Sequence, residues 1–279
     1  MKELDGRGGP AKIANPAPML ERYELKYTIP AEQVEEIAAF AKTYCHADRF
    51  SASSPDGYYQ VNSLYLDSPD FFFLRQRLNG SENRFNMRVR SYGLRPEPPY
   101  FLEVKQKSGD IVRKYRARMR ETDLEHALDP AADPAGMVMD AREAGSAVLF
   151  RSLAHTYNAA PVAMTSYRRR ALFSHCDEYA RVTFDAGLKY MPQREYRPLD
   201  VSDLLVPSDT ETLFDEGTSV ILELKCYAKQ VPLWMVDMIR RFQLRRRGFS
   251  KYSAALAQVF RRHAFDDSMM VSPFAEFKN

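Results

Sequence analysis

Several segments of the chain alternate hydrophobic and polar residues with the period of two that a β-strand requires. In the clearest one, residues 101 to 110, Glu103, Lys105 and Lys107 share one face, and Leu102 and Val104 lie on the other. The same Glu-x-Lys pattern recurs at Glu24–Lys26 and Glu223–Lys225. We therefore predict three strands that contribute paired charges to one shared face.

The same period predicts further strands, and a period near 3.6 predicts helices between them. The expected strands cover residues 22–29, 58–66, 83–92, 101–110, 111–120, 162–173, 179–188 and 220–227. Helices are expected at residues 30–44, 71–78, within 121–160, and at 232–244 and 250–263, and residues 191–217 read as a loop. We predict a single folded domain over residues 21–263, between a disordered tail of residues 1–20 and a second tail of residues 264–279.

Nearly every predicted strand has one hydrophobic face and one face that mixes basic residues with carboxylates. A polar face that simply meets water is the ordinary explanation for an antiparallel sheet. The number of long basic side chains favours another arrangement, an α+β fold in which a closed antiparallel β-barrel surrounds a charged lumen and helices cover the outside. Such a lumen would be costly if it were dry and empty, so we expect it to hold water and an anion, with phosphates as the best match to Arg and Lys.

Composition limits the remaining classes of function. The 279 residues carry 40 Lys and Arg against 37 Asp and Glu, a net charge of +3, so bulk charge predicts no nucleic-acid partner. Three cysteines without a CxxC spacing argue against a disulfide framework or a zinc site and fit a reducing cytoplasm. No run approaches the roughly 18 apolar residues of a membrane span, so no membrane insertion is expected.

Taken together, the charged motifs resemble the polyphosphate-polymerase (VTC) domain family of the triphosphate tunnel metalloenzyme superfamily. The residues that carry this resemblance are Tyr23-Glu24-Leu25-Lys26-Tyr27, Arg88-x-Arg90, Glu103-x-Lys105, Tyr167-x-Arg169, Arg181-x-Thr183-x-Asp185, Glu223-x-Lys225 and Ser250-Lys251-Tyr252. The resemblance spans about residues 20 to 262. It implies an antiparallel tunnel with a helix near its mouth, in which the terminal phosphate of ATP is added to a growing polyphosphate chain with the help of Mn²⁺ or Mg²⁺.

The resemblance also implies roles for individual residues. Catalytic phosphate-binding roles fall to Lys26, Arg88, Arg90, Lys105, Arg169, Arg181 and Lys251. Further contacts to substrate phosphates are expected from Lys107, Lys114, Arg116, Tyr167, Lys225 and Ser250. The metal is expected at Glu223, with Glu24 or Glu103 as additional ligands, because a metal that bridges phosphates needs hard oxygen donors.

One departure from the family pattern concerns the tunnel exit, where Gly248 stands in place of a second lysine of the eukaryotic polymerases. Arg245, Arg246 and Arg247 lie just before it and could replace that charge. Two alternatives to the polymerase stay open: a tunnel hydrolase that passes phosphate to water, and a non-catalytic polyanion-binding module, for example beside a membrane-protein partner. Inward carboxylates favour an enzyme, because binding an anion alone gains nothing from them.

Overall fold

A computed structural model of the chain describes residues 22–95, 97–109, 111–120, 128–129, 133–196, 205–208 and 217–262. The strands are β1 (Arg22–Ile29), β2 (Cys45–Ala47), β3 (Tyr59–Asp67), β4 (Asn83–Tyr92), β5 (Glu97–Ser108), β6 (Ile111–Met119), β7 (Ala160–Ser174), β8 (Ala180–Pro192), β9 (Val206–Pro207) and β10 (Val220–Tyr227). The α-helices are α1 (Val34–Lys42), α2 (Arg49–Ser53), α3 (Phe72–Leu78), α5 (Pro134–Met137), α6 (Ala144–Thr156), α8 (Leu233–Arg241) and α9 (Lys251–Arg262). Two short 3₁₀ helices, η1 (Ala31–Gln33) and η2 (Ala141–Glu143), precede α1 and α6.

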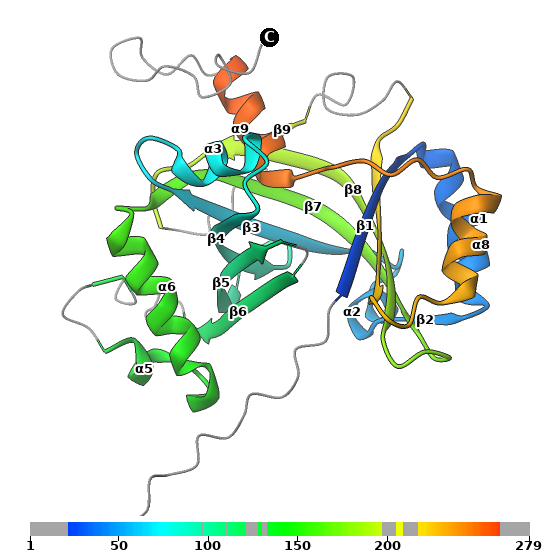
Figure 1. Cartoon of the computed structure of the whole chain (residues 1–279), viewed down its shortest axis with the longest axis horizontal. Coiled ribbons are helices and arrows are strands. Elements are labelled where there is room, and N and C mark those ends of the chain that lie inside the picture. The colour runs from blue at the N-terminus through cyan, green and yellow to red at the C-terminus, as the bar shows by residue number, and fades with distance from the viewer. Residues whose placement is uncertain are drawn as a thin grey trace, which may run out of the picture.

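All ten strands belong to one antiparallel sheet with flanking helices (Figure 1). The strand order is β1-β10-β8-β7-β3-β4-β5-β6, and the short strands β2 and β9 pair with β7 and β8. Each of the eight predicted strands is present near its expected position. The period of two therefore identified the main strands correctly, because each of them separates a polar face from a hydrophobic one.

The predicted closure of the sheet into a barrel is not confirmed. Strands β1 and β6 end the strand order, and in the described part of the chain no ladder joins them. Other segments occupy their outer edges: Arg246 forms a β-bridge with Tyr27, the Arg247 amide donates to the Lys26 carbonyl at 2.8 Å, and Val138 forms a bridge with Met119 of β6. A second ladder on the outer edge of β1 would require the positions that residues 246–247 already fill.

Helices cover the hydrophobic faces of the sheet on both flanks (Figure 1). On one flank α1 and α8 pack on β1, β10 and β8 through Ile37, Met235 and Phe184. On the other flank α6 packs on β4, β5 and β6 through Phe150 and Tyr100. With their hydrophobic faces buried in this way, the strands are left with their charged faces directed toward the hollow between the flanks.

Most of the predicted helices are present, and part of the predicted helical region lies outside the described residues. Helices α1, α3, α8 and α9 lie within the expected ranges, and α6 lies within residues 121–160. Residues 121–127 and 130–132, the two predicted tails and most of the predicted loop at 191–217 lie outside the described residues. None of the described helices has the length and apolar character needed to cross a bilayer.

Candidate functional site

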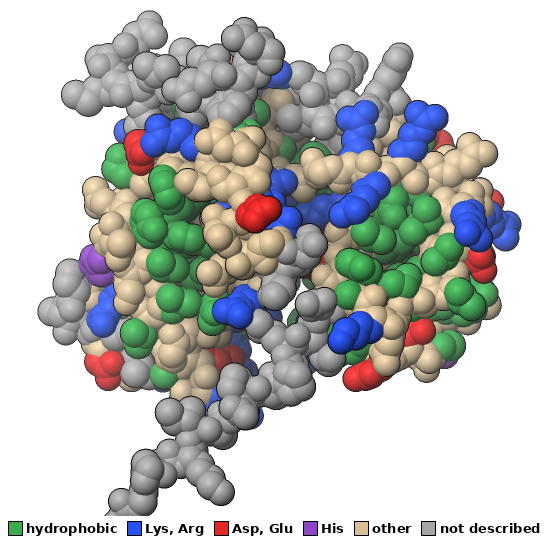
Figure 2. Space-filling model, in the orientation of Figure 1, with side chains coloured by type: hydrophobic (Ala, Val, Ile, Leu, Met, Phe, Trp, Pro, Cys, Tyr) green, Lys and Arg blue, Asp and Glu red, His purple; other side chains and the backbone are tan. Residues whose placement is uncertain are grey.

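Charged side chains from both halves of the sheet meet in the hollow between the two helical flanks. Figure 2 shows Lys and Arg side chains inside this hollow, framed by surfaces richer in hydrophobic residues. We call this hollow the tunnel. Its charged residues form three clusters, each centred on buried carboxylates.

The first cluster surrounds Glu103 on β5, whose side chain is 1% exposed. Register places Glu103 between Arg88 of β4 and Arg116 of β6. Its Oε2 lies 2.7 Å from Arg88 Nη2 and 3.8 Å from Arg90 Nε, and its Oε1 lies 2.6 Å from Lys114 Nζ and 3.1 Å from Arg116 Nε. One buried carboxylate therefore orients four basic side chains.

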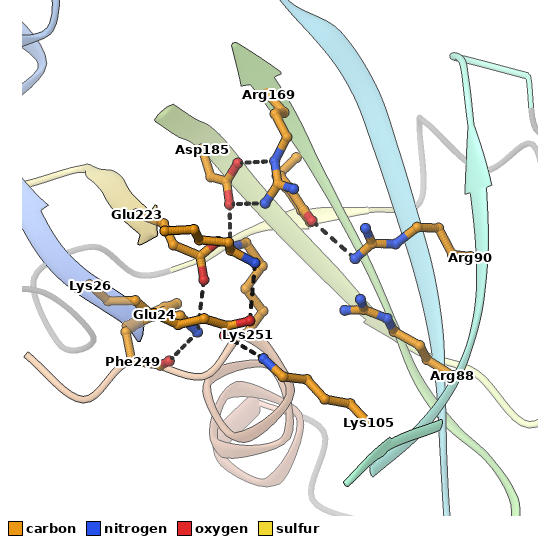
Figure 3. Close-up of polar contacts among 12 residues, drawn as sticks. Glu24, Lys26, Arg88, Arg90, Lys105, Arg169, Asp185, Glu223, Phe249 and Lys251 are labelled. Carbon is orange, nitrogen blue, oxygen red and sulfur yellow. Dashed lines mark hydrogen bonds and ion pairs between the residues drawn. The ribbon is translucent and has the colours of Figure 1, made fainter. Parts of the chain in front are cut away.

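The second cluster brings the Glu-x-Lys pairs of β1 and β10 together, because Lys26 is opposite Glu223 and Glu24 is opposite Lys225 in the ladder. Lys225 Nζ lies between the two carboxylates, 3.2 Å from Glu24 Oε1 and 3.5 Å from Glu223 Oε2. Lys105 of β5 reaches across the tunnel to Glu24 Oε2 at 2.5 Å (Figure 3). The three strands with the recurring motif thus do share one charged site.

The third cluster centres on Asp185 of β8, which is paired with Arg169 of β7 in the ladder. The Arg169 guanidinium donates to both carboxylate oxygens, at 2.6 and 2.7 Å, and Lys251 Nζ of α9 lies 2.5 Å from Asp185 Oδ2 (Figure 3). Lys251 also lies 4.5 Å from the ring centroid of Tyr167, and Arg90 Nη2 donates to the Tyr167 hydroxyl at 3.4 Å. Tyr167 therefore connects this cluster to the first one.

Two contacts position α9 and its lysine at the tunnel. The hydroxyl of buried Tyr252 donates to the carboxylate of Asp67, which also accepts the amides of Phe73 and Leu74 at the start of α3. Just before α9, the Phe249 carbonyl accepts a hydrogen bond from Lys26 Nζ at 3.0 Å. The helix is therefore tied to β3, α3 and β1 on either side of Lys251.

Burial and neighbouring charges shift the pKa values of several tunnel residues. Burial lowers the pKa of Lys26 to about 7, although Glu223 opposes this shift, and burial likewise lowers the pKa of Lys114 to about 7 against the effect of Glu103. For Glu103, burial alone would raise the pKa, but Arg88, Arg90 and the other nearby cations hold it well below its usual range. The carboxylates therefore stay ionised, and two lysines are poised to take up protons when an anion arrives.

The tunnel also has oxygen donors that suit a divalent cation. Glu24 and Glu223 both face Lys225 Nζ, so their oxygens already surround a position that favours a cation. Within the described ranges, no three His, Cys, Asp or Glu side chains gather in a way that would hold a metal ion by themselves. Mg²⁺ and Mn²⁺ sites that include substrate phosphates need only one or two carboxylates from the protein, so these two residues fit such an ion.

Most of the residues singled out from sequence converge here. The three clusters contain Glu24, Lys26, Arg88, Arg90, Glu103, Lys105, Lys114, Arg116, Tyr167, Arg169, Glu223, Lys225 and Lys251. Arg181 lies opposite Lys225 at one end of the tunnel, and Lys107 lies opposite Arg84 further along β5. The Ser250 hydroxyl accepts the Ser253 amide at 3.4 Å and so caps the start of α9.

The candidate list omitted Asp185, although it holds Arg169 and Lys251. Its place on the same strand face as Arg181 and Thr183 was visible in the sequence. Its importance was not, because its partners come from β7 and α9, which are distant in the chain. Of the predicted exit residues, Gly248 precedes α9, and Arg246 and Arg247 run along β1.

Comparison with protein-family models gives a family assignment. The family model described as "VTC domain" matches residues 21–260. Among solved structures, the Pyrococcus horikoshii protein PH1819 is similar, with a TM-score of 0.41 and 11% identity over 87% of this chain and 99% of that one. The Hippeastrum protein HpAC1, an adenylyl cyclase candidate with a dominant triphosphatase activity, gives a TM-score of 0.41 and 11% identity over 90% and 97% of the two chains.

A Bacillus halodurans adenylate cyclase candidate gives a TM-score of 0.46 and 11% identity over 83% of this chain and 96% of that one. No curated protein sequence matches the chain. The family model alone covers most of the chain, including every strand that contributes to the three clusters. The chain therefore belongs to the VTC domain family.

Proposed function

We propose that this protein is a metal-dependent polyphosphate polymerase that transfers the terminal phosphate of ATP to a growing polyphosphate chain in the tunnel. The observation that carries this proposal is the imbalance of charge. Ten basic side chains of the tunnel accompany four carboxylates: Lys26, Arg88, Arg90, Lys105, Lys114, Arg116, Arg169, Arg181, Lys225 and Lys251 against Glu24, Glu103, Asp185 and Glu223. Such an excess of partly buried positive charge needs anionic ligands to balance it.

The reaction requires little covalent chemistry from the protein. A terminal oxygen of the acceptor chain attacks the γ-phosphorus of ATP and forms a new P–O bond, while the bond from the γ-phosphorus to the β–γ bridging oxygen breaks and ADP leaves. Phosphoryl transfer depends on positioning and on charge stabilisation, which fixed guanidinium groups supply. Two pairs of cations suit this role: Arg88 and Arg90, held by Glu103, and Arg169 and Lys251, held by Asp185.

Glu24 and Glu223 would hold the divalent cation, which neutralises phosphate charge when it is bound. When phosphates and the cation enter, Lys225 has to release at least one of its two carboxylate contacts. Its ammonium group would then contact a phosphate oxygen. In this proposal the carboxylates of the second cluster serve the metal, and Glu103 and Asp185 orient cations.

Polymer growth and hydrolysis would use the same phosphate-binding residues and differ only in the acceptor of the phosphate. The reaction products therefore distinguish the two activities. The purified protein is incubated with ATP and Mn²⁺, and the products are resolved on a gel and assayed for ADP and free phosphate. We expect polyphosphate together with ADP. Free phosphate without polymer would identify a hydrolase, and triphosphate binding without turnover would identify a binding module.

Matched variants connect the activity to the tunnel. Arg90→Ala, Arg169→Ala and Glu223→Ala are each expected to lower turnover by 100-fold or more, on the order of the effect of removing one preorganised charge from a transition state. Arg168→Ala is the control, because Arg168 neighbours Arg169 on β7 but is 51% exposed and pairs with Asp56 outside the tunnel. Equal activity of Arg169→Ala and Arg168→Ala would refute the proposed site.

A further inference from the structure

A cavity of about 670 Å³ opens at the end of the tunnel beside β2 and α2. Its walls include four aromatic rings and three arginines, together with His46 and Asp48: Phe50, Tyr59, Tyr92 and Phe173, and Arg49, Arg116 and Arg181. One residue of the three carboxylate clusters, Arg116 of the first, lines this cavity. The four aromatic rings distinguish this cavity from the three clusters, in which ionic pairs predominate.

The rings present a surface suited to a flat ligand. Phe50 and Tyr92 are nearly parallel, with a 5° angle between their planes and 5.9 Å between centroids, and Tyr59 lies 5.4 Å from Phe50. Phe50 is 42% exposed, and the guanidinium of the exposed Arg49 lies 4.5 Å from its ring centroid, so a base that stacks on Phe50 would take the place of this guanidinium. Aromatic rings at an open site offer stacking surface to any nucleobase, because every base has a π-face.

Arg116 and Arg181 connect the cavity to the tunnel. Arg116 contacts Glu103 and donates to the Tyr92 hydroxyl at 3.1 Å, so it belongs to both regions. Arg181 lies opposite Lys225 in the ladder, with its guanidinium 4.8 Å from the Phe173 ring centroid. Its Nε is buried without a hydrogen-bond partner, and in the described part of the chain Arg181 forms no ion pair.

We propose that this cavity binds the base and ribose of a nucleoside triphosphate whose phosphates extend past Arg181 into the tunnel. Arg181, a cation without a carboxylate partner, would meet the first phosphates. Asp185 lies four residues beyond Arg181 on β8, or about 13 Å. An extended triphosphate is shorter than this, so it would lie between the guanidinium of Arg181 and the cations of the third cluster. The nucleotide then enters beside α2, and the lengthening polyphosphate leaves at the opposite end, near α9.

This inference rests on the proposed function, in which ATP is the phosphate donor. It adds that the aromatic cavity recognises the nucleoside, so the protein should distinguish ATP from inorganic tripolyphosphate. Tripolyphosphate supplies the same phosphate contacts and leaves the cavity empty. The difference in affinity between the two ligands therefore reports on the cavity alone.

The test measures binding of the β,γ-imido analogue of ATP and of tripolyphosphate by calorimetry, with Mn²⁺ present. We expect Phe50→Ala to weaken binding of the ATP analogue roughly five-fold or more, the loss of one base–aromatic contact, and to leave tripolyphosphate binding unchanged. Phe50→Trp, which offers a larger ring, should tighten analogue binding. Leu233→Ala on α8, a change at another exposed apolar side chain, is the control and should alter neither affinity.

The outcomes separate this inference from the function on which it rests. If the wild type binds both ligands and Phe50→Ala weakens them equally or not at all, the cavity does not bind the nucleoside and the tunnel assignment stands. If the wild type binds neither ligand, the proposed function fails and the inference fails with it. Thermal denaturation of each variant checks that the fold is intact.

Discussion

Lys105 Nζ on β5 lies 2.5 Å from Glu24 Oε2 on β1, although these strands stand near opposite ends of the strand order. The two ends of the sheet thus meet through side chains. Residues 246–247 prevent a backbone ladder on the outer edge of β1, but the curvature still brings its charged face opposite that of β5. An ion pair, unlike a ladder, can open when a phosphate chain passes.

The Glu24–Lys105 pair is expected to contribute modestly to stability, because both side chains keep some exposure to solvent. In a double-mutant cycle with Glu24→Gln and Lys105→Met, we expect a coupling energy of about 1 kcal/mol in the free energy of unfolding. Urea denaturation measures it. Saturating tripolyphosphate should reduce the coupling, because a phosphate would then satisfy Lys105; a coupling that tripolyphosphate leaves unchanged would show that the pair does not open for the ligand.

Glu103 should matter more for stability, since it is buried and lies within 4 Å of four cations. Replacing it by Gln leaves those cations without their carboxylate, and we expect a loss of about 3 kcal/mol in the free energy of unfolding. Glu97→Gln, an exposed change on the same strand, is the control. Tripolyphosphate should stabilise Glu103→Gln more than it stabilises the wild type, and the opposite order would argue that phosphates do not reach this cluster.

The pH dependence of binding should reveal Lys26. In the free protein its pKa is about 7, below the 10.5 of an unfolded lysine, so the unfolded state binds more protons between these values. This residue's contribution to stability therefore rises with pH from about 7 to 10.5 and is smallest below 7. A bound polyanion favours the protonated form, so above pH 7 binding takes up a proton and the affinity falls as pH rises, by at most about tenfold per pH unit.

Lys26→Arg separates this effect from the titration of the phosphates themselves, because arginine stays protonated. At pH 8, calorimetry of tripolyphosphate binding in two buffers of different ionisation enthalpy gives the number of protons taken up. We expect a smaller number for Lys26→Arg than for the wild type, with the remaining uptake due to Lys114. The same number in both proteins would mean that Lys26 does not titrate at the phosphate site.

The sequence predicted the ionic face of the tunnel better than its ends. Alternation along β1, β5 and β10 placed Glu24, Glu103 and Glu223 on polar faces, because a strand's period is visible over eight residues. Strand β2 and helix α2 were not predicted, since three and five residues are too few to show a period. The sequence did not indicate a binding role for Phe50, because that role depends on its contact with Tyr92 of β4, a distant part of the chain.

The predicted closed barrel shows a second limit. The two faces of a strand follow from local alternation. Closure of the sheet depends instead on which segment of the chain pairs with each edge strand. On β1 that segment is residues 246–247, between α8 and α9, where the sequence has no strand period. The connection from α8 to α9 thus pairs with the outer edge of β1, and the same connection positions Lys251.

Arg84 and Lys107 allow a test that distinguishes product binding from donor binding. They lie directly opposite each other on β4 and β5, and like charges in such a position repel. Neither forms an ion pair with a described residue. Arg77 of α3 lies close enough to Arg84 that, after burial, the charge of Arg84 is the next cause that lowers the pKa of Arg77. The cavity beside α2 lies at the other end of β4, near Tyr92, so a triphosphate bound from there would not need this pair, but a longer chain passing toward α3 would.

We therefore expect the double variant Arg84→Ala/Lys107→Ala to bind the ATP analogue with nearly wild-type affinity and to release shorter polyphosphate. Gel electrophoresis of the products at equal ATP consumption measures the length distribution. Arg113→Ala serves as the control, because Arg113 of β6 is an exposed cation whose position alternates away from the face of Lys114. Unchanged product length in the double variant would indicate that the chain leaves by another route, whereas a large loss of analogue binding would place the donor's phosphates, rather than the product, between Arg84 and Lys107.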